Sequence, residues 1–200
     1  MERNTAKRTL EKLLSVCICL CMLGAMLPAQ VFAEEADTAQ TEIVQDTAPK
    51  DTVYLSSADD LIQLAKDCRL DSWSQNRTVV LEADIDLFGV DFNGIPSFGG
   101  TWEGQNHAIT GLSLSQDGSV QGLFRYVQQG ALVRDMMVKG RIKPGGTRAS
   151  VGGIAGSNAG TIENCAFDGV VSGTSQIGGI AGVNTVKGSI NGCAVSGTVY

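Results

Sequence analysis

An eight-residue segment recurs almost unchanged in this chain, and this repeat restricts the possible folds more than any other feature. Residues 177–184, Ile-Gly-Gly-Ile-Ala-Gly-Val-Asn, copy residues 151–158, Val-Gly-Gly-Ile-Ala-Gly-Ser-Asn, 26 residues earlier. A weaker copy, Val-Gln-Gly-Leu-Phe, begins at Val120. Self-similarity at a period of roughly 20–50 residues is typical of stacked repeat architectures.

A second signature accompanies the repeat and places apolar residues at positions i, i+3 and i+5. Positions i+3 and i+5 share one strand face because side chains alternate, whereas position i has an odd offset. The chain must therefore bend between i and i+3. Position i+2 holds residue types that tolerate a left-handed backbone, namely Gly111, Asp135, Asn164 and Gly192 in the four copies.

The two signatures predict an all-β chain in which residues 79–200 form a right-handed parallel β-helix. The four copies start 24, 29 and 28 residues apart, so each coil would hold three short strands and three turns. Equivalent residues of stacked coils would form three inward columns. These are Ile109, Val133, Ile162 and Ile190; then Leu112, Met136, Cys165 and Cys193; then Leu114, Val138, Phe167 and Val195.

A leucine-rich horseshoe is the rival fold, because its pattern also has apolar residues at i, i+3 and i+5. It expects Asn or Cys at i+8, and a helix or helical turn on the convex side. The four copies have other residues at i+8, namely Asp117, Arg141, Val170 and Thr198. The segments between them are rich in Gly, Ser and Thr, which disfavours the horseshoe.

The first 33 residues have the order of segments typical of a secretory signal peptide. Basic residues precede a mostly apolar run from Leu13 to Leu27, and Val31-Phe32-Ala33 provides small or apolar residues for cleavage. We expect cleavage between Ala33 and Glu34, with an uncleaved anchor as the alternative. The apolar run is short for a spanning helix, which needs about 20 residues. The mature chain is therefore expected to be extracellular, without a membrane segment.

Two further segments are expected before the repeats. Residues 34–52 carry six acids and almost no large apolar side chain, which predicts a disordered linker. Residues 53–78 predict an N-terminal cap with a helix near 57–69, because Ser57 can cap the first turn and Asp60 can reach back to it. Tyr200 falls within a predicted strand, so we expect the chain to be a fragment of a longer protein.

The sequence Gly-Gly-Ile-Ala-Gly-x-Asn, followed by Gly-Thr-Ile-Glu-Asn-Cys and a Gly-Val-Val tail, resembles the GLUG-type repeat of bacterial surface proteins. The segment 98–112 resembles the opening coil that commonly precedes such repeats. The resemblance covers residues 79–200 and implies a parallel β-helix in a secreted or cell-surface, adhesin-like protein of a Gram-positive bacterium. Similar repeats occur in adhesins and in immunoglobulin-A-cleaving metallopeptidases. In those peptidases the zinc domain is separate, and this chain has no His-Glu-x-x-His, so that activity does not carry over.

No catalytic constellation is evident in the sequence, and no cofactor is expected. His107 is the only histidine, and it has no partner at a recognisable spacing, so we interpret it as structural. Asp84, Asp86 and Asp91 are candidates for calcium binding, because carboxylates on one strand face can hold Ca²⁺. The alternative is a solvated edge that discourages strand pairing. Residues 152–156 are glycine-rich, but the Gly-Lys-Ser/Thr of a phosphate loop is missing.

The cysteine and aromatic residues allow two interpretations each. Three cysteines remain after cleavage, an odd number that does not predict a disulfide framework. We interpret Cys165 and Cys193 as small buried residues, with a bridge between them as the alternative. The burial of Cys68 and the redox state of all three stay open. The aromatic residues could form a platform for sugars or could belong to the core and cap: Trp73, Phe98, Trp102 and Tyr126.

The charge of the chain limits its partners. Cleavage would change the formal charge from −6 to −8, since four basic and two acidic side chains are removed. An acidic chain without a basic stripe is a poor ligand for nucleic acid. We expect a non-catalytic stalk or adhesive module that binds glycans or surface proteins. The alternatives are part of a β-helix polysaccharide lyase or hydrolase, in which Arg77, Arg125, Arg134 or Arg141 would face the acids, and the repeat region of a surface metallopeptidase.

Overall fold

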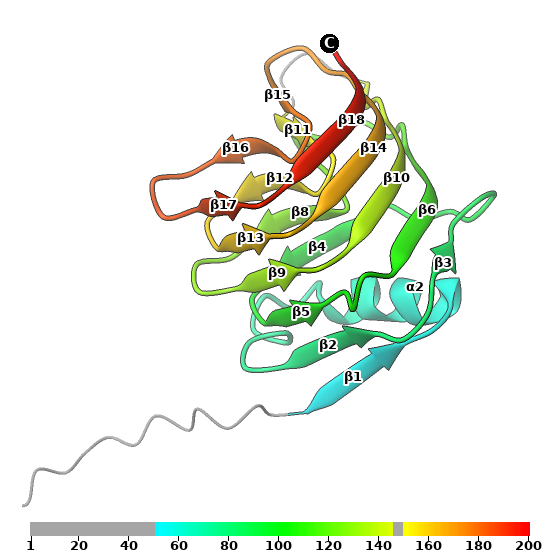
Figure 1. Ribbon diagram of the computed structural model, residues 1–200, viewed down its shortest axis with the longest axis vertical. Coiled ribbons are helices and arrows are strands. Elements are labelled where there is room, and N and C mark those ends of the chain that lie inside the picture. Colours follow the sequence, from blue (N-terminus) through cyan, green and yellow to red (C-terminus); the bar gives the residue numbers. More distant parts are fainter. Residues whose placement is uncertain (1–50, 146–149) are drawn as a thin grey trace, which may run out of the picture. The chain divides into compact units, whose positions relative to one another are not determined.

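A computed structural model describes residues 51–145 and 150–200 of the chain. Within these residues the backbone winds into a parallel β-solenoid of about five turns, as Figure 1 shows. The predicted signal peptide, its cleavage site at Ala33 and Glu34, and residues 34–50 of the predicted linker lie outside the described residues.

Each complete coil contributes one strand to each of four parallel sheets, rather than the three strands expected. The first sheet contains β1 (Thr52–Leu55), β2 (Thr78–Leu81), β5 (Thr101–Glu103), β9 (Leu132–Arg134), β13 (Thr161–Glu163) and β17 (Ser189–Asn191). The second contains β3 (Ile85–Asp86), β6 (Ala108–Leu114), β10 (Met137–Ile142), β14 (Ala166–Val171) and β18 (Ala194–Val199).

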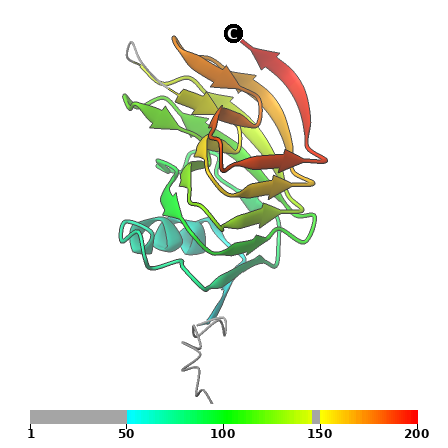
Figure 2. The ribbon, with the colours of Figure 1, turned by 90° about the vertical axis from the view of Figure 1, so that its left-hand side faces the viewer.

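The other two sheets complete the coil. The third sheet contains β7 (Val120–Gln121), β11 (Ser150–Gly152) and β15 (Gln176–Gly178). The fourth contains β4 (Ile95–Phe98), β8 (Phe124–Val127), β12 (Ala155–Asn158) and β16 (Ala181–Asn184). In the part of the chain that the structure describes, α2 (Ala58–Asp67) is the only helix, and it lies at the β1 end of the stack (Figure 2). A horseshoe with helices along its convex side is therefore wrong.

The predicted register is confirmed in the last three coils. Val133, Ile162 and Ile190 are paired partners in the first sheet. In the second sheet, Val138, Phe167 and Val195 are paired in the same way. Met136 and Cys165 occupy equivalent bends, because their carbonyls accept from the Ala166 and Ala194 amides at 2.9 and 3.0 Å. Val195 is nevertheless 47% exposed, since β18 lies at the edge of its sheet.

The predicted columns are wrong in the coil before these. Trp102, not Ile109, pairs with Val133, and Ile109 pairs with Val138. Leu112 and Leu114 of that coil also differ from their predicted partners, Met136 and Val138. Leu112 pairs with Gly140, and Leu114 pairs with Ile142. The cause is a longer bend, because residues 104–107 connect β5 to β6 whereas residues 135–136 connect β9 to β10. Both inserted residues, Gln105 and Asn106, have positive φ.

A left-handed backbone is confirmed at all four predicted positions, although only three of them are bends between strands. The φ angles are 69° at Gly111, 56° at Asp135, 51° at Asn164 and 59° at Gly192. At Asp135, Asn164 and Gly192 the bend turns the chain from the first sheet into the second, and Asn164 Nδ2 donates to Asp135 Oδ1 of the neighbouring coil at 3.2 Å. Gly111 instead lies at the irregularity within the pairing of β6 and β10.

The N-terminal end of the solenoid is closed by α2, as predicted. Ser57 caps the helix by accepting from the Asp60 amide at 3.2 Å, and Asp60 Oδ2 accepts from the Ser56 amide at 3.0 Å. Leu61 and Leu64 are buried against the coil core. β1 starts at Thr52, within the predicted linker, and pairs with β2, so it forms the first layer of the first sheet.

The interior of the solenoid is mainly apolar, with a few buried polar residues such as Asn158. Its largest side chains are Trp102, Phe98 and Phe124, which pack with ring centroids 5.2–6.1 Å apart. No helix within residues 51–145 or 150–200 is long and apolar enough to cross a membrane.

Candidate functional site

The single histidine has a partner that the sequence did not reveal. His107 Nδ1 lies 3.0 Å from Asp84 Oδ1, and the same oxygen accepts from the Ala108 amide at 2.8 Å. The bond from the Ala108 amide, followed by that from His107, lowers the pKa of Asp84 below its ordinary value. The pair joins neighbouring coils, which agrees with the interpretation of His107 as structural.

The other two calcium candidates face solvent separately. Asp86 Oδ1 accepts from the Phe88 amide at 3.0 Å and from Thr110 Oγ1 at 3.3 Å. Asp91 Oδ1 lies 3.5 Å from Asn93 Nδ2. Ile85 and Leu87 are buried. Asp84 and Asp86, which alternate with them, are exposed, as the alternation of side chains predicted. Across the described ranges, no three His, Cys, Asp or Glu side chains gather closely enough to hold a metal ion. The calcium site therefore stays a prediction.

The cysteines pack into the solenoid. Cys68 and Cys165 are buried, and this burial raises the pKa of each thiol to about 12. Cys193 is half-buried, and all three thiols are free, so a Cys165–Cys193 bridge is not formed. Thiols with raised pKa values are poor nucleophiles.

Most of the predicted aromatic platform is core. Phe98 and Trp102 are completely buried, so a role in contacting sugars is wrong for these two. Trp73 is partly buried, and the Arg77 guanidinium stacks over its ring at 4.3 Å. Tyr126 differs from the others, because 45% of it is exposed on the outer face of β8.

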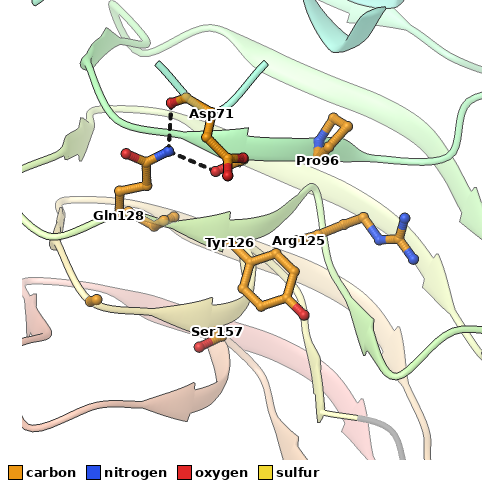
Figure 3. A pocket seen from close by; sticks show the side chains of 9 residues that line it. Asp71, Pro96, Arg125, Tyr126, Gln128 and Ser157 are labelled. Carbon is orange, nitrogen blue, oxygen red and sulfur yellow. Dashed lines mark hydrogen bonds between the residues drawn. The ribbon is translucent and has the colours of Figure 1, made fainter. Parts of the chain in front are cut away.

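Tyr126 lies in a groove of about 610 Å³ over the outer face of the fourth sheet, shown in Figure 3. The groove is lined by residues of three successive strands and by the loop that follows α2. The lining residues are Asp71, Pro96, Ser97, Arg125, Tyr126, Val127, Gln128, Ser157 and Ala159.

The backbone of β8 explains why two consecutive side chains reach this groove. Phe124 and Val127 are buried, while Arg125 and Tyr126 between them point outward. The register places Ser97 and Ser157 on either side of Tyr126. The centre of the groove is therefore one aromatic ring flanked by two hydroxyl groups.

Gln128 fixes one end of the groove. Its Nε2 donates to the Asp71 carbonyl and to Ser97 Oγ, both at 2.7 Å, and its Oε1 accepts from Gln75 Nε2 at 3.0 Å. These bonds hold the loop after α2 against the fourth sheet. Sequence reasoning missed Asp71, Ser97, Gln128 and Ser157, because no motif links residues so far apart; Asp71 and Gln128 alone are separated by 57 positions.

Arg125 fixes the opposite side of the groove. Its Nε donates to the Val120 carbonyl at 3.1 Å, and in Figure 3 its guanidinium extends on the side of Tyr126 away from Gln128. Within residues 51–145 and 150–200 it forms no ion pair. Arg125 and Pro96 also border a second hollow of about 310 Å³, which Lys66 and Arg69 of the α2 region line.

Two of the other arginines considered for an enzyme are engaged elsewhere. Arg134 binds Glu103 through two nitrogens at 2.6 and 2.9 Å, and it lies 3.7 Å from Asp135 and 4.0 Å from Glu163. These acids raise the pKa of Arg134, with the hydrogen bond to Glu103 as the main cause. Arg77 lies 3.8 Å from Asp51.

The glycine-rich repeat forms turns between sheets. A side chain at Gly152 would collide with the carbonyl of Ala155 and with Gly182 of the next coil, and one at Gly153 would collide with Gly179 and Phe167. The glycines thus permit close stacking of coils, which agrees with the rejection of a phosphate loop.

Comparisons with known proteins agree with this architecture. Residues 147–172 match the family described as the GLUG motif. The chain is similar to halomucin of Haloquadratum walsbyi, with 30% identity over 176 residues that cover 79% of this chain and 2% of halomucin. The chain thus spans only about 2% of the length of that relative. No solved structure matches the chain.

These matches indicate a repeat module. The predicted Gram-positive source stays a prediction, because halomucin is archaeal. The recurring glycines, the left-handed bends and the match at residues 147–172 lead to one conclusion: the chain contains a GLUG repeat within a parallel β-solenoid.

Proposed function

We propose that this chain is exported and serves as a non-catalytic repeat module of a surface protein, whose outer faces bind glycans or proteins. The observation that carries the proposal is the GLUG match within a stack of parallel coils. The similarity to halomucin over most of this chain supports an extracellular location. Removal of residues 1–33 during export, with cleavage between Ala33 and Glu34, belongs to the same proposal.

The solenoid is proposed to be right-handed. Parallel strands of one sheet that are joined by a crossover follow this hand in about 98% of cases. Each sheet here consists of parallel strands joined by a complete coil, so every coil is a crossover of this kind.

The non-catalytic part of the proposal is supported by the state of the reactive groups. His107 is held by Asp84, and the Cys68 and Cys165 thiols are buried with raised pKa values. The groove residues offer hydrogen bonds, one aromatic face and one cation, which are groups suited to binding.

The test begins with expression of the full chain in a bacterial host that secretes proteins. We expect the product in the medium, with Glu34 as its first residue by N-terminal sequencing. The purified product is then applied to an array of glycans and to immobilised cell-surface proteins. Binding to neither would contradict the proposed function.

A second arm separates binding from catalysis. The product is incubated with pectin, alginate and host glycans, and released sugars are followed by chromatography. We expect no release above a buffer control. Turnover would replace the proposal with a carbohydrate-active enzyme, and peptide release from immunoglobulin A would replace it with a peptidase.

A further inference from the structure

We infer that the groove around Tyr126 binds a carboxylated saccharide, with the carboxylate at Arg125 and a sugar ring against the face of Tyr126. This inference rests on the proposed binding function and names a ligand class for one face of the solenoid. It is carried by an exposed aromatic ring, a guanidinium without a carboxylate partner in the described residues, and acceptors and hydroxyl groups in one groove.

The guanidinium of Arg125 is available and oriented. The bond from its Nε to the Val120 carbonyl at 3.1 Å fixes the side chain and leaves both terminal nitrogens for a ligand. A guanidinium presents paired N–H donors that match a carboxylate, whereas a neutral sugar hydroxyl uses only one. The arrangement therefore favours a saccharide that carries an acid group.

The hollow that adjoins the groove adds cations to the surroundings of Arg125, whereas Asp117 lines another hollow beside Arg125. Lys66 and Arg69 line the adjoining hollow together with Arg125, and Asp91 is the acid of that hollow. Within the described part of the chain, Lys66 and Arg69 form no ion pairs. A saccharide with several acid groups can therefore continue from the groove past Arg125 towards α2.

The remaining groups of the groove match sugar hydroxyls. Asp71 is the acid of the groove, and its exposed carboxylate can accept hydrogen bonds from hydroxyl groups. Ser157 lies beside Tyr126 in the register of the fourth sheet. The exposed face of Tyr126 offers an apolar surface to the C–H side of a pyranose ring, as aromatic side chains do when they combine apolar and polar contacts. Acid, hydroxyl and ring contacts thus converge in one place.

The experiment measures binding of the secreted full chain to two acid ligands and their neutral counterparts. Isothermal titration calorimetry is run with trigalacturonic acid and its methyl ester, and with sialyllactose and lactose. We expect at least one acid ligand to bind and its neutral counterpart to bind at least about tenfold more weakly, because a charged hydrogen bond is lost. Added salt is expected to weaken the acid ligand's binding.

Two groove variants and two matched controls locate the site. Arg125→Gln and Tyr126→Ala are expected to weaken binding of the acid ligand at least about tenfold. Arg141→Gln on β10 and Tyr54→Ala on β1 remove the same exposed residue types from other sheets and are expected to leave affinity unchanged. Arg125→Lys keeps the charge but loses the paired donors, so an intermediate affinity is expected. Circular dichroism melting shows that each variant is folded.

The outcomes distinguish this inference from the proposed function. If neither acid ligand binds, or if the groove variants bind as well as the controls, the groove inference is wrong. The proposed function survives that result when the chain still binds other glycans or proteins on the array. Loss of all binding on the array would overturn both.

Discussion

Asn158 Nδ2 donates to Oδ1 of Asn184 in the next coil at 2.8 Å, and the two residues occupy the same position of the repeated segment. Asn158 is completely buried and also bonds the Gly160 and Ser189 carbonyls at 3.2 Å and the Gly160 amide at 3.1 Å. Asn184 repeats the pattern by donating to the Gly188 carbonyl at 3.2 Å. The asparagine that ends each repeat therefore supports the turn from the fourth sheet back to the first.

Replacement of this buried asparagine is expected to destabilise the solenoid. Asn158→Ala removes its buried hydrogen bonds to the Gly160 amide, the Gly160 and Ser189 carbonyls and Asn184, which lowers the free energy of unfolding by about 2–3 kcal/mol. Urea unfolding followed by far-ultraviolet circular dichroism measures the change. The control, Asn191→Ala, alters an exposed asparagine in the first sheet and is expected to change stability by less than about 0.5 kcal/mol. Equal effects in both variants would argue against the role of Asn158.

The aromatic centre of the core provides a second prediction. Trp102→Ala removes a completely buried side chain that contacts Phe98 and Phe124, and it is expected to cost about 3–5 kcal/mol. Trp73→Ala removes a partly buried tryptophan at the surface and is expected to cost less. Chemical unfolding curves of both variants test this ranking. A smaller loss of unfolding free energy for Trp102→Ala than for Trp73→Ala would contradict the central packing of Trp102.

Arg134 is expected to stabilise the stack through charge. In Arg134→Gln, the Glu103, Asp135 and Glu163 carboxylates keep their positions without a cation between them. The variant should therefore unfold at a lower urea concentration, and the difference should shrink in high salt, which screens the repulsion. Arg141→Gln serves as the control, because Arg141 forms no ion pair in the described ranges. A salt-independent difference would rule out this explanation.

The Asp84–His107 pair predicts a pH dependence with a definite sign. The pKa of Asp84 is lowered in the folded chain, so its carboxylate stabilises the fold above the ordinary value of 3.8. As the pH falls below that value, the unfolded chain takes up the proton first and the stabilisation is lost. Asp84→Asn should therefore be less stable than the parent at pH 7, and the difference in their free energies of unfolding should be smaller at pH 3. The urea concentration at the midpoint of unfolding is measured for both proteins at pH 7 and at pH 3. A difference between them that is larger at pH 3 would contradict the prediction.

The cysteines are expected to differ in reactivity. Iodoacetamide should modify Cys193, which is half-buried, well before Cys68 and Cys165, which are buried with thiol pKa values raised to about 12. Peptide mass mapping after timed labelling separates the three sites. In urea all three should react at similar rates, and early labelling of Cys165 in the folded chain would contradict its burial.

The sequence by itself determined the repeating part of the fold. Val133, Ile162 and Ile190 could be aligned because stacked parallel strands place equivalent residues of each repeat in contact. The repeat period therefore fixes which residues pair between coils. The bends at Asp135, Asn164 and Gly192 followed from residue type, since a left-handed backbone excludes most side chains. The helix cap at Ser57 followed from local hydrogen bonding.

The tertiary structure decided everything that depends on how many residues each coil contains. The longer bend at Gln105 and Asn106 placed Trp102 below Val133 and moved Ile109 into the second sheet. The contacts of Asp84 with His107, and of Gln128 with the Asp71 carbonyl, join residues 23 and 57 positions apart. Such pairs arise only when the winding of every intervening coil is fixed, because one inserted residue rotates all later side chains relative to the layer below.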